Sequence, residues 1–125
     1  MILIFFKTTF KVNIKIMSKH HLGEFEEVVM LTVAILNGKA YGIAIIEELE
    51  NRLNRKVSIG ALQTVLRRLE KKGYLNSELG EATQERGGKR KRFFTVTNYG
   101  IQILEETKKQ RMSLWEAIPN LSFNN

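Results

Sequence analysis

The amino-acid sequence predicts one small α+β domain that is mainly helical. Three observations lead to this prediction: apolar residues recur at helical spacing in four segments, the pattern becomes strand-like between the third and fourth of them, and 125 residues is a length typical of a single domain. Hydrophobic residues make up 43% of the chain, which is enough to bury a modest core.

Apolar spacing predicts three helices in the first half of the chain, at residues 22–36, 41–53 and 59–72. Ser58 is a favourable N-cap for the third helix, and Gly73 follows it at the position where glycine commonly ends a helix. The predicted inner faces are Phe25, Val28, Val29, Thr32, Ile35 and Leu36 in the first helix, Ile45, Ile46, Leu49 and Leu53 in the second, and Leu62, Val65, Leu66 and Leu69 in the third.

Two strands and a last helix are expected in the second half. Residues 74–79 and 92–96 are predicted strands, joined by a loop rich in glycine and charge at residues 80–91. Thr97 or Asn98 is expected to cap a helix over residues 99–118, which Pro119 ends before a polar tail at residues 119–125.

Residues 1–17 differ from the rest, since they contain no acidic residue and only short apolar runs. Lys7 and Lys11 interrupt the segment, so it is too short for a secretory signal or a membrane span. Two interpretations stay open: a β-prone arm, or an N-terminal extension that lies upstream of the true start at Met17. No association with a membrane is expected.

The composition excludes much catalytic chemistry. Without cysteine there is no thiolate nucleophile, thiolate metal site or disulfide, and all 13 acidic residues are Glu, so a Ser-His-Asp triad lacks its Asp. The two histidines, His20 and His21, are adjacent and would point in different directions on a helix. We therefore expect no enzyme, cofactor or metal, and the lack of cysteine fits a cytoplasmic protein.

The net charge of +7 favours a partner that carries phosphate, either nucleic acid or, less often, an anionic membrane surface. Residues 58–98 hold nine Lys or Arg against four Glu, a net +5. Opposite its leucine face the third predicted helix carries Gly60, Thr64, Arg67 and Lys71, with Gln63 and Arg68 beside them. Such a face suits the DNA major groove, where Gln reads adenine and Arg reads guanine or holds phosphate. An ordinary solvated face is the alternative.

The loop after this helix is cationic as well. Its run Arg86-Gly87-Gly88-Lys89-Arg90-Lys91-Arg92 places two glycines between cations at a hairpin tip, which can lie along the DNA backbone or enter a minor groove. It is not a phosphate-binding P-loop, because Thr83 stands where the first glycine is required and Arg90 follows Lys89. The helix and the hairpin together predict a winged helix-turn-helix over residues 18–98.

The last predicted helix, residues 99–118, carries an apolar stripe. A single helix cannot bury both of its sides in so small a domain, so we expect the stripe to form the seam of a homodimer. Its members are Ile101, Leu104, Met112, Trp115 and Ile118.

Several motifs in this order resemble the PadR family of bacterial transcriptional regulators. They are Leu22-Gly23-Glu24-Phe25-Glu26, Tyr41-Gly42, Ser58-Ile59-Gly60-Ala61-Leu62, the run LRRLEKKGY at residues 66–74, and the run GGKRKRFFTVTNYG at residues 87–100. The resemblance implies a dimeric winged-helix repressor of the compact subclass with one C-terminal helix. It also implies relief by a small aromatic or drug-like effector, for which Trp115 and Met112 are the candidate contacts.

One departure from the family concerns the third helix. The family usually has Tyr-Pro after the small residues, and the tyrosine hydroxyl commonly touches the DNA backbone, whereas this sequence has Gln63-Thr64. Gln63 is expected to replace that contact, either at a phosphate or at the edge of an adenine.

The sequence thus predicts a regulator that binds a roughly palindromic double-stranded DNA operator. The expected DNA contacts are Ser58, Gly60, Ala61, Gln63, Thr64, Arg67, Arg68, Lys71 and Lys72 from the helix, and Arg86, Lys89 and Arg90 from the wing. Two alternatives are a winged helix that binds another protein, and an adaptor that lies on a membrane surface through the N-terminal arm and the wing.

Overall fold

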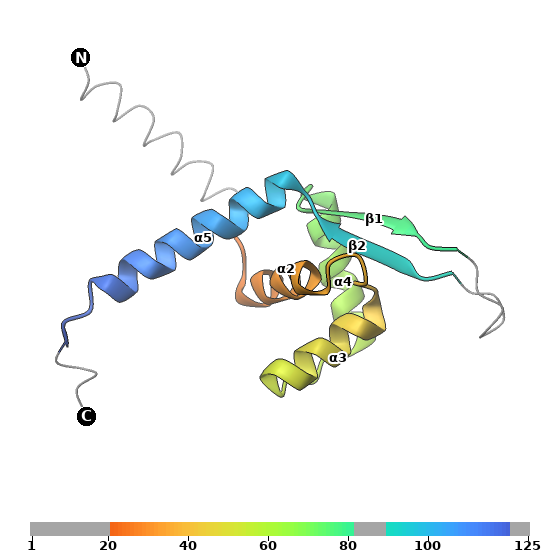
Figure 1. Ribbon diagram of the computed structural model, residues 1–125, viewed down its shortest axis with the longest axis horizontal. Coiled ribbons are helices and arrows are strands. Elements are labelled where there is room, and N and C mark those ends of the chain that lie inside the picture. Colours follow the sequence, from red (N-terminus) through yellow and green to blue (C-terminus); the bar gives the residue numbers. More distant parts are fainter. Residues whose placement is uncertain (1–20, 82–89, 121–125) are drawn as a thin grey trace, which may run out of the picture.

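The computed structural model describes residues 21–81 and 90–120 (Figure 1). Its elements are α2 (Glu24–Leu36), α3 (Gly42–Leu53), α4 (Ile59–Lys71), β1 (Leu75–Leu79), β2 (Arg92–Val96) and α5 (Asn98–Glu116). The predicted α+β class, mainly helical, and the predicted order of elements are confirmed. The N-terminal extension, residues 1–17, lies outside the described residues.

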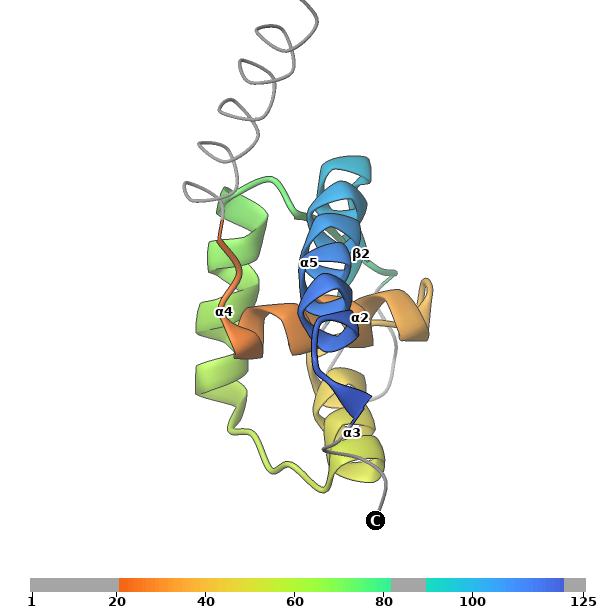
Figure 2. The same cartoon turned by 90° about the vertical axis from the view of Figure 1, so that its left-hand side faces the viewer.

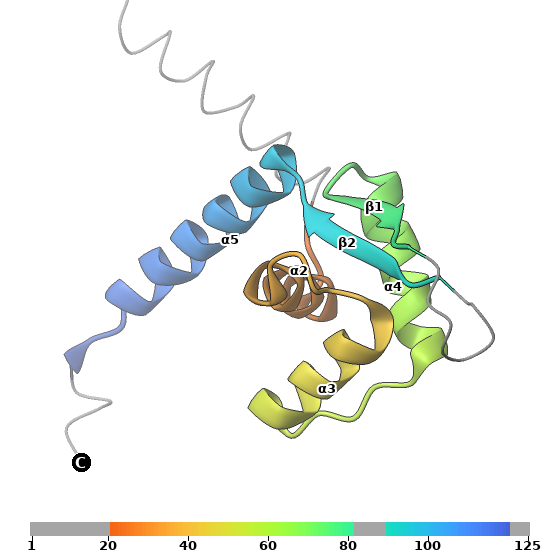
Figure 3. The ribbon, with the colours of Figure 1, turned by 45° about the vertical axis from the view of Figure 1, so that its right-hand side comes forward.

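Three helices, a hairpin and a projecting helix make up this architecture. Helices α2, α3 and α4 pack together, and strands β1 and β2 form an antiparallel hairpin that extends beyond α4 (Figure 3). The register runs from Leu75 opposite Val96 to Leu79 opposite Arg92. The segment before α3 lies alongside the hairpin, since the backbone N–H of Phe94 donates to the carbonyl oxygen of Ala40 at 2.8 Å.

The core lies where α2, α3, α4 and the hairpin meet. The predicted inner face of α4 is confirmed, since all four of its members are buried. Two other predictions were wrong: Ile35 is 50% exposed and Leu53 is 55% exposed. Both stand in the last turn of their helices, and in α2 the buried positions are taken instead by Met30 and Val33.

Side-chain caps fix where α4 and α5 begin. The Oγ of Ser58 accepts from the backbone N–H of Ala61 at 3.2 Å, as predicted. At α5 the cap is Thr97 rather than Asn98, and its Oγ1 accepts from Gly100 at 3.0 Å. Gly73 has φ +83°, a conformation that glycine adopts readily, and this allows the sharp turn from α4 into β1.

Helix α5 crosses α2 (Figure 2) and then runs away from the helical body (Figure 1). Ile103 is buried in the core and Leu104 is packed against it, so the first half of α5 belongs to its own domain. Farther along, the guanidinium Nη2 of Arg111 lies 2.6 Å from the carboxylate Oε1 of Glu27 on α2. From residue 108 onward the described side chains of α5 are exposed.

Candidate nucleic-acid interface

The exposed face of α4 carries most of the predicted DNA contacts. Because Leu62, Leu66 and Leu69 turn into the core, the opposite side of the helix is left to solvent. Six predicted residues there are exposed: Gly60, Ala61, Gln63, Thr64, Arg67 and Arg68. Ser58 and Lys71, one at each end, are exposed as well, although the Ser58 hydroxyl is engaged in capping the helix.

A cleft of about 780 Å³ separates α4 from the hairpin. Gln63, Arg67 and Glu70 line it from α4, together with Ile59, and Arg90, Lys91 and Arg92 line it from the opposite side. Tyr41, Gly42 and Ile43, where α3 begins, contribute the third side. Among the described residues, four cations and one carboxylate therefore line this cleft.

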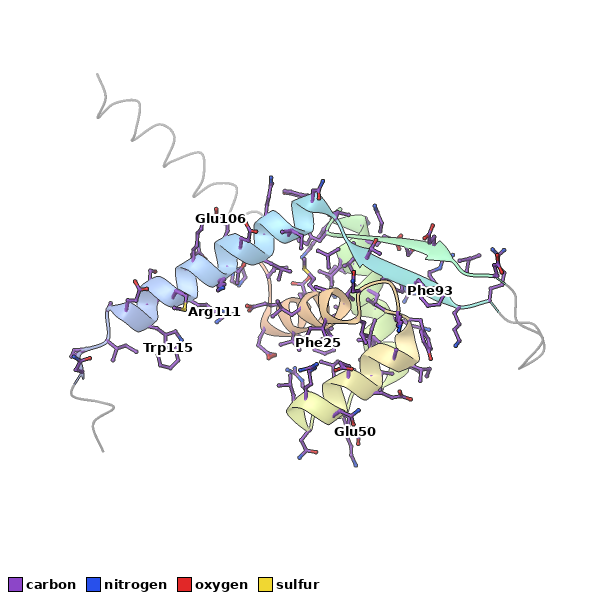
Figure 4. All side chains as sticks on the ribbon, viewed as in Figure 1. Phe25, Glu50, Phe93, Glu106, Arg111 and Trp115 are labelled. Atoms are coloured by element: carbon purple, nitrogen blue, oxygen red, sulfur yellow. The ribbon has the colours of Figure 1, made fainter. Side chains whose placement is uncertain are left out.

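Specific contacts hold the described wing cations in place. The Nε of Arg90 donates to the carbonyl oxygen of Gly80 at 2.6 Å, which ties the two sides of the hairpin together. The ammonium of Lys91 lies 4.2 Å from the centroid of the Tyr41 ring, a cation–π geometry. The ring of Phe93, labelled in Figure 4, meets the same Tyr41 ring edge-on at 5.7 Å. The base of the wing is thus fixed to the start of α3.

Glu70, the acidic residue among the described lining of the cleft, is also engaged. The Oγ of Ser77 on β1 donates to Oε2 of Glu70 at 2.6 Å, and the Nη1 of Arg92 donates to the same Ser77 oxygen at 3.0 Å. This chain connects α4, β1 and β2. It places the positive charge of Arg92 close to the Glu70 carboxylate and so weakens the repulsion that Glu70 would exert on phosphate.

Lys72 differs from the other predicted contacts of α4, because its side chain reaches α2. Its ammonium lies 2.9 Å from Oε2 of Glu26, a side chain that is nearly buried, and Oε1 of Glu26 accepts from the backbone N–H of Gly23 at 2.9 Å. Burial acts to raise the pKa of Glu26, but the hydrogen bond from Gly23 and the contact with Lys72 together lower it below its ordinary value. Lys72 thus joins the end of α4 to the start of α2.

Two wing residues of the prediction, Arg86 and Lys89, lie outside the described residues. Sequence reasoning missed the contact between Lys72 and Glu26, because the partners are 46 positions apart. Glu26 stands three residues after Gly23, the position from which a glutamate can accept a hydrogen bond from the N-cap N–H, but Gly23 has no side chain that would complete the capping signal. Sequence reasoning also missed the apolar part of the cleft. Ile43 and Ile59 line it, and because they are uncharged, a search for clustered cations does not find them.

The predicted stripe on α5 divides into two parts. Leu104 is half-buried against its own core, whereas Ile101, Met112, Trp115 and Ile118 are exposed, and Leu114 beside them is 70% exposed. Figure 4 shows Trp115 near the far end of α5, away from the helical body. Among helices in the part of the chain that is described, none has the length and apolar character needed to cross a membrane.

Known proteins resemble this chain in sequence and in fold. The sequence model of the family described as "Transcriptional regulator PadR-like family" matches residues 30–106. A solved PadR-like transcription factor from Bacteroides fragilis is 27% identical, with 82% of this chain and 93% of that chain covered and a TM-score of 0.67. No curated protein matches the chain significantly in sequence.

Two further solved structures share the fold. A PadR family regulator from Eggerthella lenta is 21% identical, with 98% of this chain and 99% of that chain covered and a TM-score of 0.63. A PadR family regulator from Clostridium difficile is 22% identical, with 74% of this chain and 92% of that chain covered and a TM-score of 0.61.

Proposed function

Because the chain belongs to the PadR-like family and is a DNA-binding transcription regulator, we propose that it acts as a homodimeric repressor on a near-palindromic operator. The observation that carries this proposal is the exposed face of α4, which stands beside a cleft lined by wing cations. No catalytic role enters the proposal, since the family is one of regulators.

In this proposal α4 enters the major groove. Gln63, Thr64 and Arg67 are placed on consecutive turns of its exposed face, where amide and guanidinium groups form paired hydrogen bonds with adenine and guanine edges. The Thr64 hydroxyl donates to the carbonyl oxygen of Gly60 at 3.0 Å, so its methyl group and oxygen lone pairs remain to meet DNA. Arg68 and Lys71 hold phosphates, with the small residues Gly60 and Ala61 permitting close approach. We leave Lys72 out because of its contact with Glu26.

The wing follows the flanking backbone. One DNA strand runs through the cleft, where Arg67 stands on one side and Arg90, Lys91 and Arg92 on the other. Arg86 and Lys89, two further cations of the same loop in the sequence, complete the proposed phosphate contacts of the wing. Contacts of this kind set the position of the protein on DNA and add affinity without adding sequence information.

Helix α5 supplies the dimer contact. Its 19 residues span about 28 Å, and on its far half Met112, Leu114 and Trp115 are exposed. A second copy of the helix covers this surface, with Ile101 and Ile118 at its margins, and Leu104 contributes its exposed part. Two copies then place two α4 helices on one face of a duplex, and occupancy of an operator excludes other proteins from it.

The same region is where we place the effector site. Trp115 offers a planar apolar surface and Met112 an adaptable neighbour, which together suit a flat aromatic molecule held between the two copies. Binding of such a molecule changes the angle between the two copies and thereby lowers the affinity of the dimer for the operator.

The test is binding to duplex DNA taken from upstream of the protein's own gene, against a scrambled duplex, over a salt titration. We expect preference for the natural duplex at physiological salt, and Gln63→Ala should change that preference by about 1–3 kcal/mol. Lys56→Ala, an exchange in the loop before α4, serves as the comparison. Equal, weak and steeply salt-dependent binding to both duplexes would reject specific recognition and leave the protein-binding alternative.

A further inference from the structure

The cleft between α4 and the wing has an apolar part that phosphate binding does not explain. Ile43 is 44% exposed and Ile59 is 43% exposed, and both line the cleft that also holds Gln63 and Arg67. A surface that only neutralises phosphate needs cations and polar donors, and large aliphatic side chains among them reduce its solvation.

Ile59 is held in a defined position. A Cβ atom on Gly42 would come within 3.1 Å of the Cδ1 of Ile59, so the isoleucine rests directly on the start of α3. Ile59 is also the first residue of α4, immediately after the capped Ser58. Its exposed part therefore belongs to a rigid corner where two helices begin.

Ile59 shares a face of α4 with a base-reading candidate. Positions 59 and 63 are one helical turn apart, and both side chains reach the same cleft. An amide at Gln63 pairs with the N6 and N7 atoms of adenine in the major groove, while an aliphatic group one turn away meets the only apolar feature that the groove displays, the 5-methyl group of thymine.

We propose that Ile59, assisted by Ile43, forms a thymine-methyl subsite, so that this corner of α4 selects A·T pairs next to the position read by Gln63. The cations around the cleft bring duplex DNA to it, and the two isoleucines distinguish among duplexes. This inference rests on the proposed function, since it requires α4 to lie in the major groove.

The test uses a duplex selected from a random pool for tight binding to the full chain. Each thymine in turn is replaced by deoxyuridine, which removes one methyl group and leaves every hydrogen-bonding edge unchanged. We expect about fourfold weaker binding at one or two thymines per half-site, the effect of one methyl group returned to water, and little change at the others.

Ile59→Ala should remove this sensitivity to deoxyuridine, whereas Ile59→Val should keep most of it. Ile35→Ala is the matched control, because Ile35 is a similarly exposed isoleucine that is not among the residues lining the cleft. For this variant, the ratio of the affinity for the thymine duplex to the affinity for the deoxyuridine duplex should equal that of the unchanged protein. Ile59 is exposed, so its exchange is expected to leave the fold intact, which a thermal unfolding curve checks.

The outcomes separate the two proposals. Tight, selective binding that is insensitive to every deoxyuridine exchange, or a sensitivity that persists in Ile59→Ala, would overturn the methyl subsite and leave the proposed function standing. Failure to select any duplex from the pool would overturn both.

Discussion

Arg111 on α5 and Glu27 on α2, 84 positions apart in the sequence, form an ion pair. Two nitrogens of the guanidinium donate to the carboxylate oxygen Oε1: Nη2 lies 2.6 Å from it and Nε lies 3.1 Å from it. Among the ion pairs between described side chains, it is the one farthest along α5. Charge-assisted pairs with this geometry define an angle as well as a distance. The pair therefore helps to set the direction in which α5 leaves the helical body.

Exchange of Glu27 for Gln should loosen that angle. Because the angle sets the separation of the two α4 helices in a dimer, the variant should tolerate half-sites moved by one or two base pairs, which the unchanged protein discriminates against. Binding to a series of duplexes with altered spacing measures this. Glu48→Gln is the control, because it breaks an ion pair with Arg52 that lies within α3. If both variants show the same preference for half-site spacing, the ion pair of Arg111 with Glu27 does not set the angle of α5.

Lys71 and Lys72, although adjacent, should behave differently. Lys71 is exposed and should hold a phosphate, so Lys71→Ala should lower the slope of log K against log salt by about one. Lys72 contacts Glu26, so Lys72→Met should leave the salt slope unchanged. The same exchange should lower the free energy of unfolding by about 1–2 kcal/mol. This loss is smaller than for a fully buried ion pair, because the Lys72 side chain is 33% exposed. Salt titrations and denaturant unfolding of both variants test the assignment.

Glu26 predicts how stability depends on acid. Its pKa in the folded protein is lowered below the ordinary value of 4.5, so the carboxylate stabilises the fold above its unfolded pKa, and this stabilisation is lost as the pH falls through the folded pKa. Glu26→Gln should therefore be less stable than the unchanged protein near pH 7 and should approach it below pH 4.5. Unfolding curves across this range provide the measurement, and a constant difference down to pH 2 would contradict it.

The wing should contribute affinity without sequence preference. Lys89→Ala combined with Arg90→Ala should weaken binding to all duplexes alike and lower the salt slope by about two. Lys108→Ala combined with Lys109→Ala removes the same charge from α5 and should change the slope less. If the two double variants are indistinguishable, the wing has no direct role.

Trp115 provides a direct report on the dimer. It is 61% exposed on the single chain, so burial against a second α5 should shift its fluorescence to shorter wavelength, and dilution should reverse the shift. An emission spectrum that stays constant over the whole dilution series, in a sample shown to change its mass, would place the dimer contact elsewhere.

Local signals predicted the elements and the inner face of α4 well. The caps at Ser58 and near Thr97, the glycine at position 73 and the spacing of Leu62, Val65, Leu66 and Leu69 are all properties of neighbouring residues, and the structure confirms each of them. The first half of α5 was harder, because apolar spacing does not distinguish a core face from an interface. Ile103, which is not a member of the predicted stripe, is buried in the domain's own core.

The parts of the site that could not be predicted depend on contacts between distant segments. Nothing near Lys72 in the sequence indicates that Glu26 is its partner, and nothing near Ile59 indicates that it rests on Gly42. Such contacts arise only once α2, α3 and α4 have packed, and for Lys72 the contact with Glu26 favours a structural role over the predicted phosphate contact. Charge counting alone assigns every lysine of α4 to DNA.

The most direct test of the account is a hydroxyl-radical footprint on a selected duplex. Two α4 helices on one face of DNA predict two symmetric protected blocks about one helical turn apart, with further protection on the outer flanks from the wings that disappears in the Lys89→Ala, Arg90→Ala variant. A single unsymmetric block, or protection spread evenly along the duplex, would contradict the dimeric winged-helix account.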